Sequence, residues 1–122
     1  FDAGLVRTGT VTATEGYRCA LELLTQPDRP TALFCYNDSV AMGAYDAIRQ
    51  LGLAIPNDVA VVGFDNLEVI ATQLRPALTT MELPHYAMGQ WAVQYLLDHA
   101  QDGELAPVQQ TIPCRLIERK SA

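Results

Sequence analysis

The sequence is poor in basic residues and in long apolar runs, and each shortage excludes a class of partner. Its 122 residues contain eight Lys and Arg against fourteen Asp and Glu, which gives a net charge of −6. The only basic cluster lies at 115–120, so the chain as a whole does not attract a phosphate backbone. Asp, Asn or Gly interrupts the apolar windows well before the roughly 20 residues that cross a bilayer. We therefore expect no membrane span, and no nucleic-acid binding by this chain itself.

Patterns typical of reactive sites are also scarce. The cysteines, Cys19, Cys35 and Cys114, are an odd set without a C-x-x-C pair, so free thiols are expected rather than disulfides or metal ligands. The sequence contains no G-x-S-x-G, no H-E-x-x-H and no glycine-rich phosphate loop. His85 and His99 are isolated, which indicates structural roles. We expect no metal and no cofactor, and acid-base or metal chemistry by carboxylates is the weaker interpretation of the polar residues described next.

The length fits one domain, or one lobe of a larger fold, with enough apolar residues for a core. The first residues, Phe1-Asp2-Ala3-Gly4, contain neither an initiator Met nor a basic-then-apolar signal pattern. The chain is therefore expected to come from inside a longer protein.

Two apolar segments that end in carboxylate and amide side chains are the most informative feature. Buried strands are expected at 31–36 and 59–64, each followed directly by polar residues. The segment between them has helical periodicity and closes at Gly52, so strand, helix and strand form a right-handed parallel crossover. Such sheets bind ligands outside the carboxyl ends of their strands. At that edge we expect the four polar residues Asn37, Asp38, Asp65 and Asn66.

The remaining pattern completes an α/β fold, a Rossmann-like parallel sheet flanked by helices. Further strands are expected at 5–11 and 78–81, and further helices from Thr14, over 67–73 and, with an unusually apolar surface, over 85–100. Thr14 and either Asn37 or Asp38 are the expected helix caps, and Asp38 is interpreted as a cap rather than a ligand contact. Gly52 is expected to end its helix in a left-handed conformation. Segment 109–118 contains Pro113, which favours an edge strand.

Six motifs resemble one protein family in the expected order. They are Pro30-Thr31-Ala32-Leu33-Phe34-Cys35-Tyr36-Asn37-Asp38, Ala41-Met42-Gly43-Ala44, Leu51-Gly52-Leu53 with Ile55-Pro56-Asn57-Asp58-Val59, Val62-Gly63-Phe64-Asp65-Asn66, Pro76-Ala77-Leu78-Thr79-Thr80 and Arg115-Leu116-Ile117-Glu118-Arg119. Over nearly the whole chain they resemble the effector-binding core of LacI/GalR-family transcription regulators. The resemblance implies a periplasmic-binding-protein-like fold of two Rossmann-like lobes, with a sugar or nucleobase effector between them.

On that resemblance, residues 1–122 form an effector-binding domain that consists mainly of the C-terminal lobe. Helix 85–100 then belongs to, or packs on, an N-terminal lobe that the sequence lacks, or on a partner chain, because its apolar residues need cover. Folding back on its own lobe is the remaining alternative. The implied partners are a small-molecule effector, a second copy in a homodimer, and operator DNA bound by a helix-turn-helix domain outside this chain. The implied location is the cytoplasm.

The resemblance also assigns candidate effector ligands. Asp65 is the first, since a carboxylate accepts charge-assisted hydrogen bonds from sugar hydroxyls or a ring N–H, and the alternative is that it caps the following turn. Asn37 can both donate and accept, against simple helix capping, and Ser39 is a further candidate contact. Val11 stands where relatives often carry a stacking aromatic residue, and Leu83 where many carry Gln. A sugar or polyol is therefore expected rather than a purine.

The implied function is effector sensing by a DNA-binding transcription regulator, in which ligand binding between the lobes changes the affinity for DNA. The alternative is an extracytoplasmic sugar-binding protein of a transporter, which shares the Asn-Asp and Gly-Phe-Asp motifs. The segment 78–80 and the ending 116–119 favour the regulators. A helix-turn-helix or a signal peptide upstream would separate the two classes.

Overall fold

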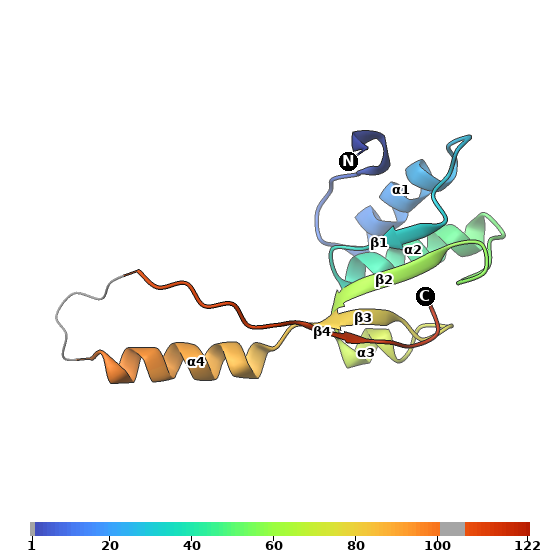
Figure 1. Cartoon of the computed structure of the whole chain (residues 1–122). Coiled ribbons are helices and arrows are strands. Elements are labelled where there is room, and N and C mark those ends of the chain that lie inside the picture. The colour runs from blue at the N-terminus through green and yellow to red at the C-terminus, as the bar shows by residue number, and fades with distance from the viewer. Residues whose placement is uncertain (1, 101–106) are drawn as a thin grey trace.

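The fold is a four-stranded sheet flanked by helices, seen in a computed structural model that describes residues 2–100 and 107–122 (Figure 1). The strands are β1 (Ala32–Phe34), β2 (Ala60–Asp65), β3 (Thr79–Glu82) and β4 (Arg115–Ile117). The helices are α1 (Ala13–Leu24), α2 (Asp38–Gln50), α3 (Glu68–Ala71) and α4 (His85–Asp98), preceded by a short 3-10 helix η1 (Ala3–Leu5). This arrangement confirms the predicted α/β class.

The sheet has the order β1-β2-β3-β4. The pairs β1-β2 and β2-β3 are parallel, with Phe34 opposite Val62 and Asp65 opposite Glu82. The predicted parallel crossover is therefore confirmed. Strand β4 runs antiparallel to β3 at the edge of the sheet, which confirms the predicted edge strand in a shorter form. Because they run in parallel, β1, β2 and β3 have their carboxyl ends at the same end of the sheet. The candidate site lies at that end.

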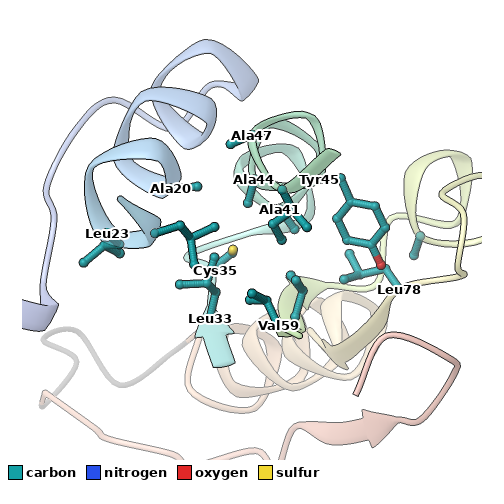
Figure 2. Packing of buried hydrophobic residues seen from close by; sticks show 14 residues of the cluster. Ala20, Leu23, Leu33, Cys35, Ala41, Ala44, Tyr45, Ala47, Val59 and Leu78 are labelled. Carbon is teal, nitrogen blue, oxygen red and sulfur yellow. The ribbon is translucent and has the colours of Figure 1, made fainter. Parts of the chain in front are cut away.

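The core lies where α1 and α2 meet the sheet. Figure 2 shows buried side chains of α1, α2 and β1 and of Val59, just before β2, facing one another, and Tyr45, drawn beside Leu78, is fully buried. Its hydroxyl donates to the Pro76 carbonyl at 3.0 Å, so the one polar atom of this large side chain is satisfied. The two helices approach closely because each contributes a buried glycine, Gly16 and Gly43.

Three local predictions were wrong. Segment 5–11 forms no strand. Its first residue, Leu5, is the last residue of η1, and the apolar side chains of Leu5 and Val11 remain exposed. The first helix is capped by Thr12 rather than Thr14, since the Thr12 hydroxyl accepts from the Glu15 amide at 3.3 Å. Asp38 is not a cap, because Asn37 fills that position and Asp38 turns inward. The left-handed Gly52, with φ of 70°, agrees with expectation.

Helix α4 and the returning segment 107–114 project away from the lobe as an arm (Figure 1). No residue of α4 is buried, and large side chains such as Tyr86 and Leu97 are exposed. The helix therefore does not fold back on its own lobe. Over the described part of the chain, no helix is both long and apolar enough to span a membrane.

Candidate functional site: the rim at the carboxyl ends of the strands

Three of the predicted site residues lie at the carboxyl ends of the parallel strands, a region that we call the rim. Asn37 follows β1, Asp65 is the last residue of β2, and Leu83 follows β3. The ladder continues one step past β1, since the Cys35 amide donates to the Val62 carbonyl at 2.8 Å. Asn37 and Asp65 therefore emerge from adjacent parallel segments, as the sequence predicts.

Asn37 caps α2 and keeps hydrogen-bonding capacity for a ligand. Its side-chain oxygen accepts from the Val40 amide at 2.9 Å. Its amide nitrogen has no hydrogen-bond partner within residues 2–100 and 107–122, and neither has the hydroxyl of the half-exposed Ser39. Capping and ligand binding, which the sequence left as alternatives for Asn37, are thus compatible: one atom caps and the other is available to an acceptor.

Asp65 lies in an unusual backbone turn. Asp65 has φ of 104° and Asn66 has φ of 55°, both in the left-handed region that non-glycine residues seldom occupy. The Asp65 carboxylate has no hydrogen-bond or ion-pair partner among the described residues, so it does not cap the turn. A strained position that presents an unpartnered carboxylate at a strand end is typical of a binding site.

Asp38 is completely buried between the first turn of α2 and the sheet. One carboxylate oxygen accepts from the Thr80 hydroxyl and the other from the Leu67 amide, both at 2.6 Å. Burial raises the pKa of Asp38, the bonds from Thr80 and Leu67 oppose that rise, and the neighbouring charge of Asp65 adds to it. Gly63 makes room for the carboxylate, since a Cβ there would lie 2.3 Å from Asp38 Oδ1.

The C-terminal segment reaches the same turn from the other side. Arg119 donates from Nη2 to the Asn66 side-chain oxygen and from Nη1 to the Leu78 carbonyl, both at 2.8 Å. Arg119, which belongs to the basic cluster 115–120 of the sequence, is half-buried and bonded. At the opposite end of β2, the buried Ser121 hydroxyl donates to the Val61 carbonyl at 2.6 Å and accepts from the Thr79 amide at 2.8 Å.

The other two candidate residues lie in separate hollows. Val11 lines a hollow of about 630 Å3 between residues 5–11, α1 and β1, together with Tyr36. Leu83 lines a second hollow of about 500 Å3 between α4 and the returning segment, beside Trp91. Asp65 lines neither of these two. The structure thus brings Asn37 and Asp65 to one rim but does not join Val11 and Leu83 with them in one pocket.

Two features of the rim were missed by sequence reasoning. Tyr36 directly precedes Asn37 and is 75% exposed, so it offers an aromatic ring where Val11 does not. The sequence could have shown this, because Tyr36 stands next to Asn37 in the motif 30–38. The role of Asp38 depends on Thr80, which is 42 residues away, and no local pattern shows that contact.

The three cysteines are free thiols, and only Cys35 is buried. Cys35 is buried, and burial raises its pKa to about 12, with a smaller contribution from the charge of Asp38. A thiol of that pKa is neither a good nucleophile nor a good metal ligand at neutral pH. Within the described ranges, no three or more His, Cys, Asp or Glu side chains are grouped to hold a metal ion.

The mostly parallel sheet, with polar residues at the carboxyl ends of its strands, defines a lobe of the α/β class. Residues 2–122 match the periplasmic binding protein-like domain. The chain belongs to this family, and its relatives place it with the effector-binding domains of LacI/GalR-type regulators.

Curated and solved relatives agree on this placement. The HTH-type transcriptional repressor PurR of Escherichia coli O139:H28 is 42% identical over 106 residues, which are 87% of this chain and 31% of PurR. A transcriptional regulator CelR-cellobiose complex has a TM-score of 0.88 and 31% identity, over 100% of this chain and 37% of that one. The Lac repressor dimer bound to operator and the anti-inducer ONPF has a TM-score of 0.82 and 33% identity, over 93% of this chain and 34% of that one. The chain spans 31% of the length of PurR.

Proposed function

We propose that this chain is the C-terminal lobe of the effector-sensing domain of a LacI/GalR-type transcription regulator, and that its effector is a sugar or a related polyol. The observation that carries the proposal is the Asp65 carboxylate, unpartnered among the described residues and held at the rim in a left-handed turn beside the cap residue Asn37. The similarity to a regulator in complex with cellobiose supports the sugar class.

The chemistry of the rim suits vicinal hydroxyl groups. The two oxygens of Asp65 can accept two hydroxyl protons in charge-assisted bonds, which are stronger than neutral ones. The free amide nitrogen of Asn37 donates, and the Ser39 hydroxyl does either. Val11 and Leu83 line separate hollows and offer only apolar surface, and the exposed aromatic ring beside Asn37 is that of Tyr36. This balance of polar groups favours a polyhydroxylated ligand.

The lobe would act by differential binding. An effector that contacts this rim and an opposing lobe binds the closed arrangement better, and it shifts the angle between lobes by that difference in affinity. Helix 85–100 is proposed to pack on that opposing lobe or on a partner chain, since none of its residues in α4 is buried. The proposed assembly is a homodimer that binds operator DNA through a helix-turn-helix domain outside this chain. Its place of action is therefore the cytoplasm, and it has no catalytic role.

The relatives favour this proposal over the transporter alternative. PurR and CelR are named as transcriptional regulators, and the Lac repressor complex contains a dimer on operator DNA. These are properties of those proteins. They support the same role here because the similarity extends over 87% or more of this chain in each comparison.

Titration calorimetry on the full-length protein tests the proposal. A panel of mono- and disaccharides that includes cellobiose, with nucleobases as the competing class, is titrated into wild type and into Asp65→Ala. A lost charge-assisted bond costs about 1.5–3 kcal/mol, so we expect affinity for the bound sugar to fall about tenfold or more.

The matched control is Asp28→Ala. Asp28 is an exposed carboxylate in the turn before β1, at the edge of the sheet opposite the rim. Its removal makes the same change in net charge and should leave affinity unchanged. Equal sugar affinity in Asp65→Ala and wild type would remove Asp65 from the site, and binding of nucleobases alone would overturn the sugar class.

A further inference from the structure

The turn that presents Asp65 is fixed by two side chains from distant parts of the chain. Leu67, two residues after Asp65, donates its amide to the buried Asp38 carboxylate at 2.6 Å. Asn66, the residue between them, accepts from Arg119 at 2.8 Å. Successive non-glycine residues in the left-handed region are costly and persist only where surrounding contacts over-determine them. These two bonds are such contacts.

We propose that Asp38 and Arg119 are positioning residues for effector binding, which hold the turn 65–67 so that the Asp65 carboxylate faces the ligand. The inference rests on the proposed function, because it assigns to Asp38 and Arg119 a role at the same rim. Neither side chain needs to touch the effector. Each acts through the backbone or side chain next to Asp65.

Asp38 is built into the lobe as a rigid support. Both of its oxygens are used, one by Leu67 and the other by Thr80 on β3. The missing side chain at Gly63 lets the carboxylate lie against β2. Hydrogen bonds in such buried surroundings are stronger than in water, so the carboxylate fixes the turn relative to both strands.

Arg119 connects the same turn to β4. Its guanidinium joins Asn66 to the Leu78 carbonyl, and its own amide donates to the Thr79 hydroxyl at 3.0 Å. The segment 107–114 is the part of the arm that leads into β4, and Arg119 lies two residues beyond that strand. A ligand bound to Asp65 is therefore connected to β4 through Asn66 and Arg119.

Hydrogen exchange on the ligand-free, full-length protein tests the holding role without any effector. In Asp38→Ala the Leu67 amide loses its acceptor, and we expect exchange across 65–67 to quicken about tenfold relative to wild type. The control is Ser121→Ala, which breaks buried hydrogen bonds to Val61 of β2 and Thr79 of β3, away from the turn. It should lower global stability yet leave the exchange rate at 65–67, relative to that of the rest of the lobe, as it is in wild type.

Sugar binding tests the positioning role. With the panel sugar that wild type binds most tightly as the probe, we expect Asp38→Ala to weaken binding about tenfold, and the double variant with Asp65→Ala to be no weaker than Asp65→Ala alone. Asp38→Asn keeps an oxygen that can accept from the Leu67 amide, so it should restore most of the affinity. Arg119→Gln should weaken binding of the same sugar less than Asp38→Ala does.

The outcomes separate this inference from the proposed function. Exchange at 65–67 in Asp38→Ala that matches Ser121→Ala would overturn the holding role, whatever the sugar result. A mobile turn with wild-type sugar affinity would overturn the positioning role while the proposed function stands. If wild type binds none of the panel sugars, the proposed function and the effector part of the inference both fail, and exchange still decides whether Asp38 holds the turn. If Asp38→Ala does not fold, Arg119→Gln carries the test, because it removes the bond to Asn66 while Asp38 stays in place. Exchange at 65–67 and sugar affinity that both match wild type in Arg119→Gln would then overturn the inference.

Discussion

At the scale of single residues, the buried Asp38 makes stability depend on pH in an unusual direction. Its pKa is raised in the folded protein, chiefly by burial, so the folded state binds more protons than the unfolded state over the interval just above the ordinary Asp pKa. The contribution of Asp38 to stability is therefore fully present below that ordinary value and is lost as pH rises through the raised pKa. Most partnered carboxylates show the opposite slope.

The matching prediction compares wild type with Asp38→Asn. Urea unfolding at a series of pH values from about 4, the ordinary Asp value, to neutrality should show that wild type gains stability relative to the variant as pH falls. Asp28→Asn controls for the loss of one carboxylate. A difference between wild type and Asp38→Asn that grows as pH rises would contradict the direction given for Asp38.

The rim residues also show which parts of a site a sequence can predict. Asn37 and Asp65 each follow an apolar strand directly, so the strand pattern alone placed them at one edge. The contacts of Asp38 could not be found in that way, because Thr80 and Leu67 are brought to it only by the folding of β2 and β3. Asn37 and Asp38 are neighbours with similar propensity to cap a helix. Only the tertiary structure shows that Asn37 is the cap and that Asp38 is the buried support.

At the scale of elements, the crossing of α1 and α2 depends on two glycines. A Cβ at Gly43 would lie 1.8 Å from the Ala13 carbonyl oxygen, and one at Gly16 would lie 2.2 Å from the Val40 carbonyl oxygen. In both cases the obstacle is backbone, which cannot rotate away. The two helices can therefore keep this separation only while both positions lack a side chain.

Replacing Gly43 with Ala should force α1 and α2 apart. We expect the free energy of unfolding to fall by about 3 kcal/mol or more, at the upper end of the range for overpacking. Denaturant unfolding measures the loss. The control Asp46→Ala changes an exposed position on the same helix and should stay within about 0.5 kcal/mol of wild type. A Gly43→Ala protein as stable as this control would show that the helices can separate without cost.

The elements themselves were largely predictable, with one informative failure. The strands ending near Phe34 and Asp65 and the helix closing at Gly52 follow from apolar runs, caps and turn residues. Segment 5–11 has suitable residues for a strand, but no described strand pairs with it. Whether a segment finds a partner strand depends on how distant parts of the chain fold together, which the local pattern does not show. The error at the first helix cap was avoidable, since Thr12 and Glu15 have the spacing of a capping box.

At the scale of the whole molecule, the arm is separable from the lobe. Helix α4 has no buried residue, although it carries exposed apolar side chains such as Tyr86, Val93 and Leu97. Burying each large apolar side chain gains about 1.5–3 kcal/mol, so the helix favours any surface that covers it. We expect that surface to be the opposing lobe in the full-length protein and a second copy when the chain is isolated.

Excising the arm tests this separation. Glu82 at the end of β3 pairs with Arg115 at the start of β4, and their side chains form an ion pair at 3.0 Å. A short Gly-containing turn can therefore replace 83–114 and join the two strands as a β-hairpin. We expect the shortened lobe to unfold cooperatively and to sediment as a monomer, whereas chain 1–122 associates as its concentration rises. The lobe should fold without the arm because its buried core comes from residues 20–78, entirely outside the excised segment. A shortened chain that does not fold would make the arm part of the core, and association equal to that of chain 1–122 would show that another surface forms the contact.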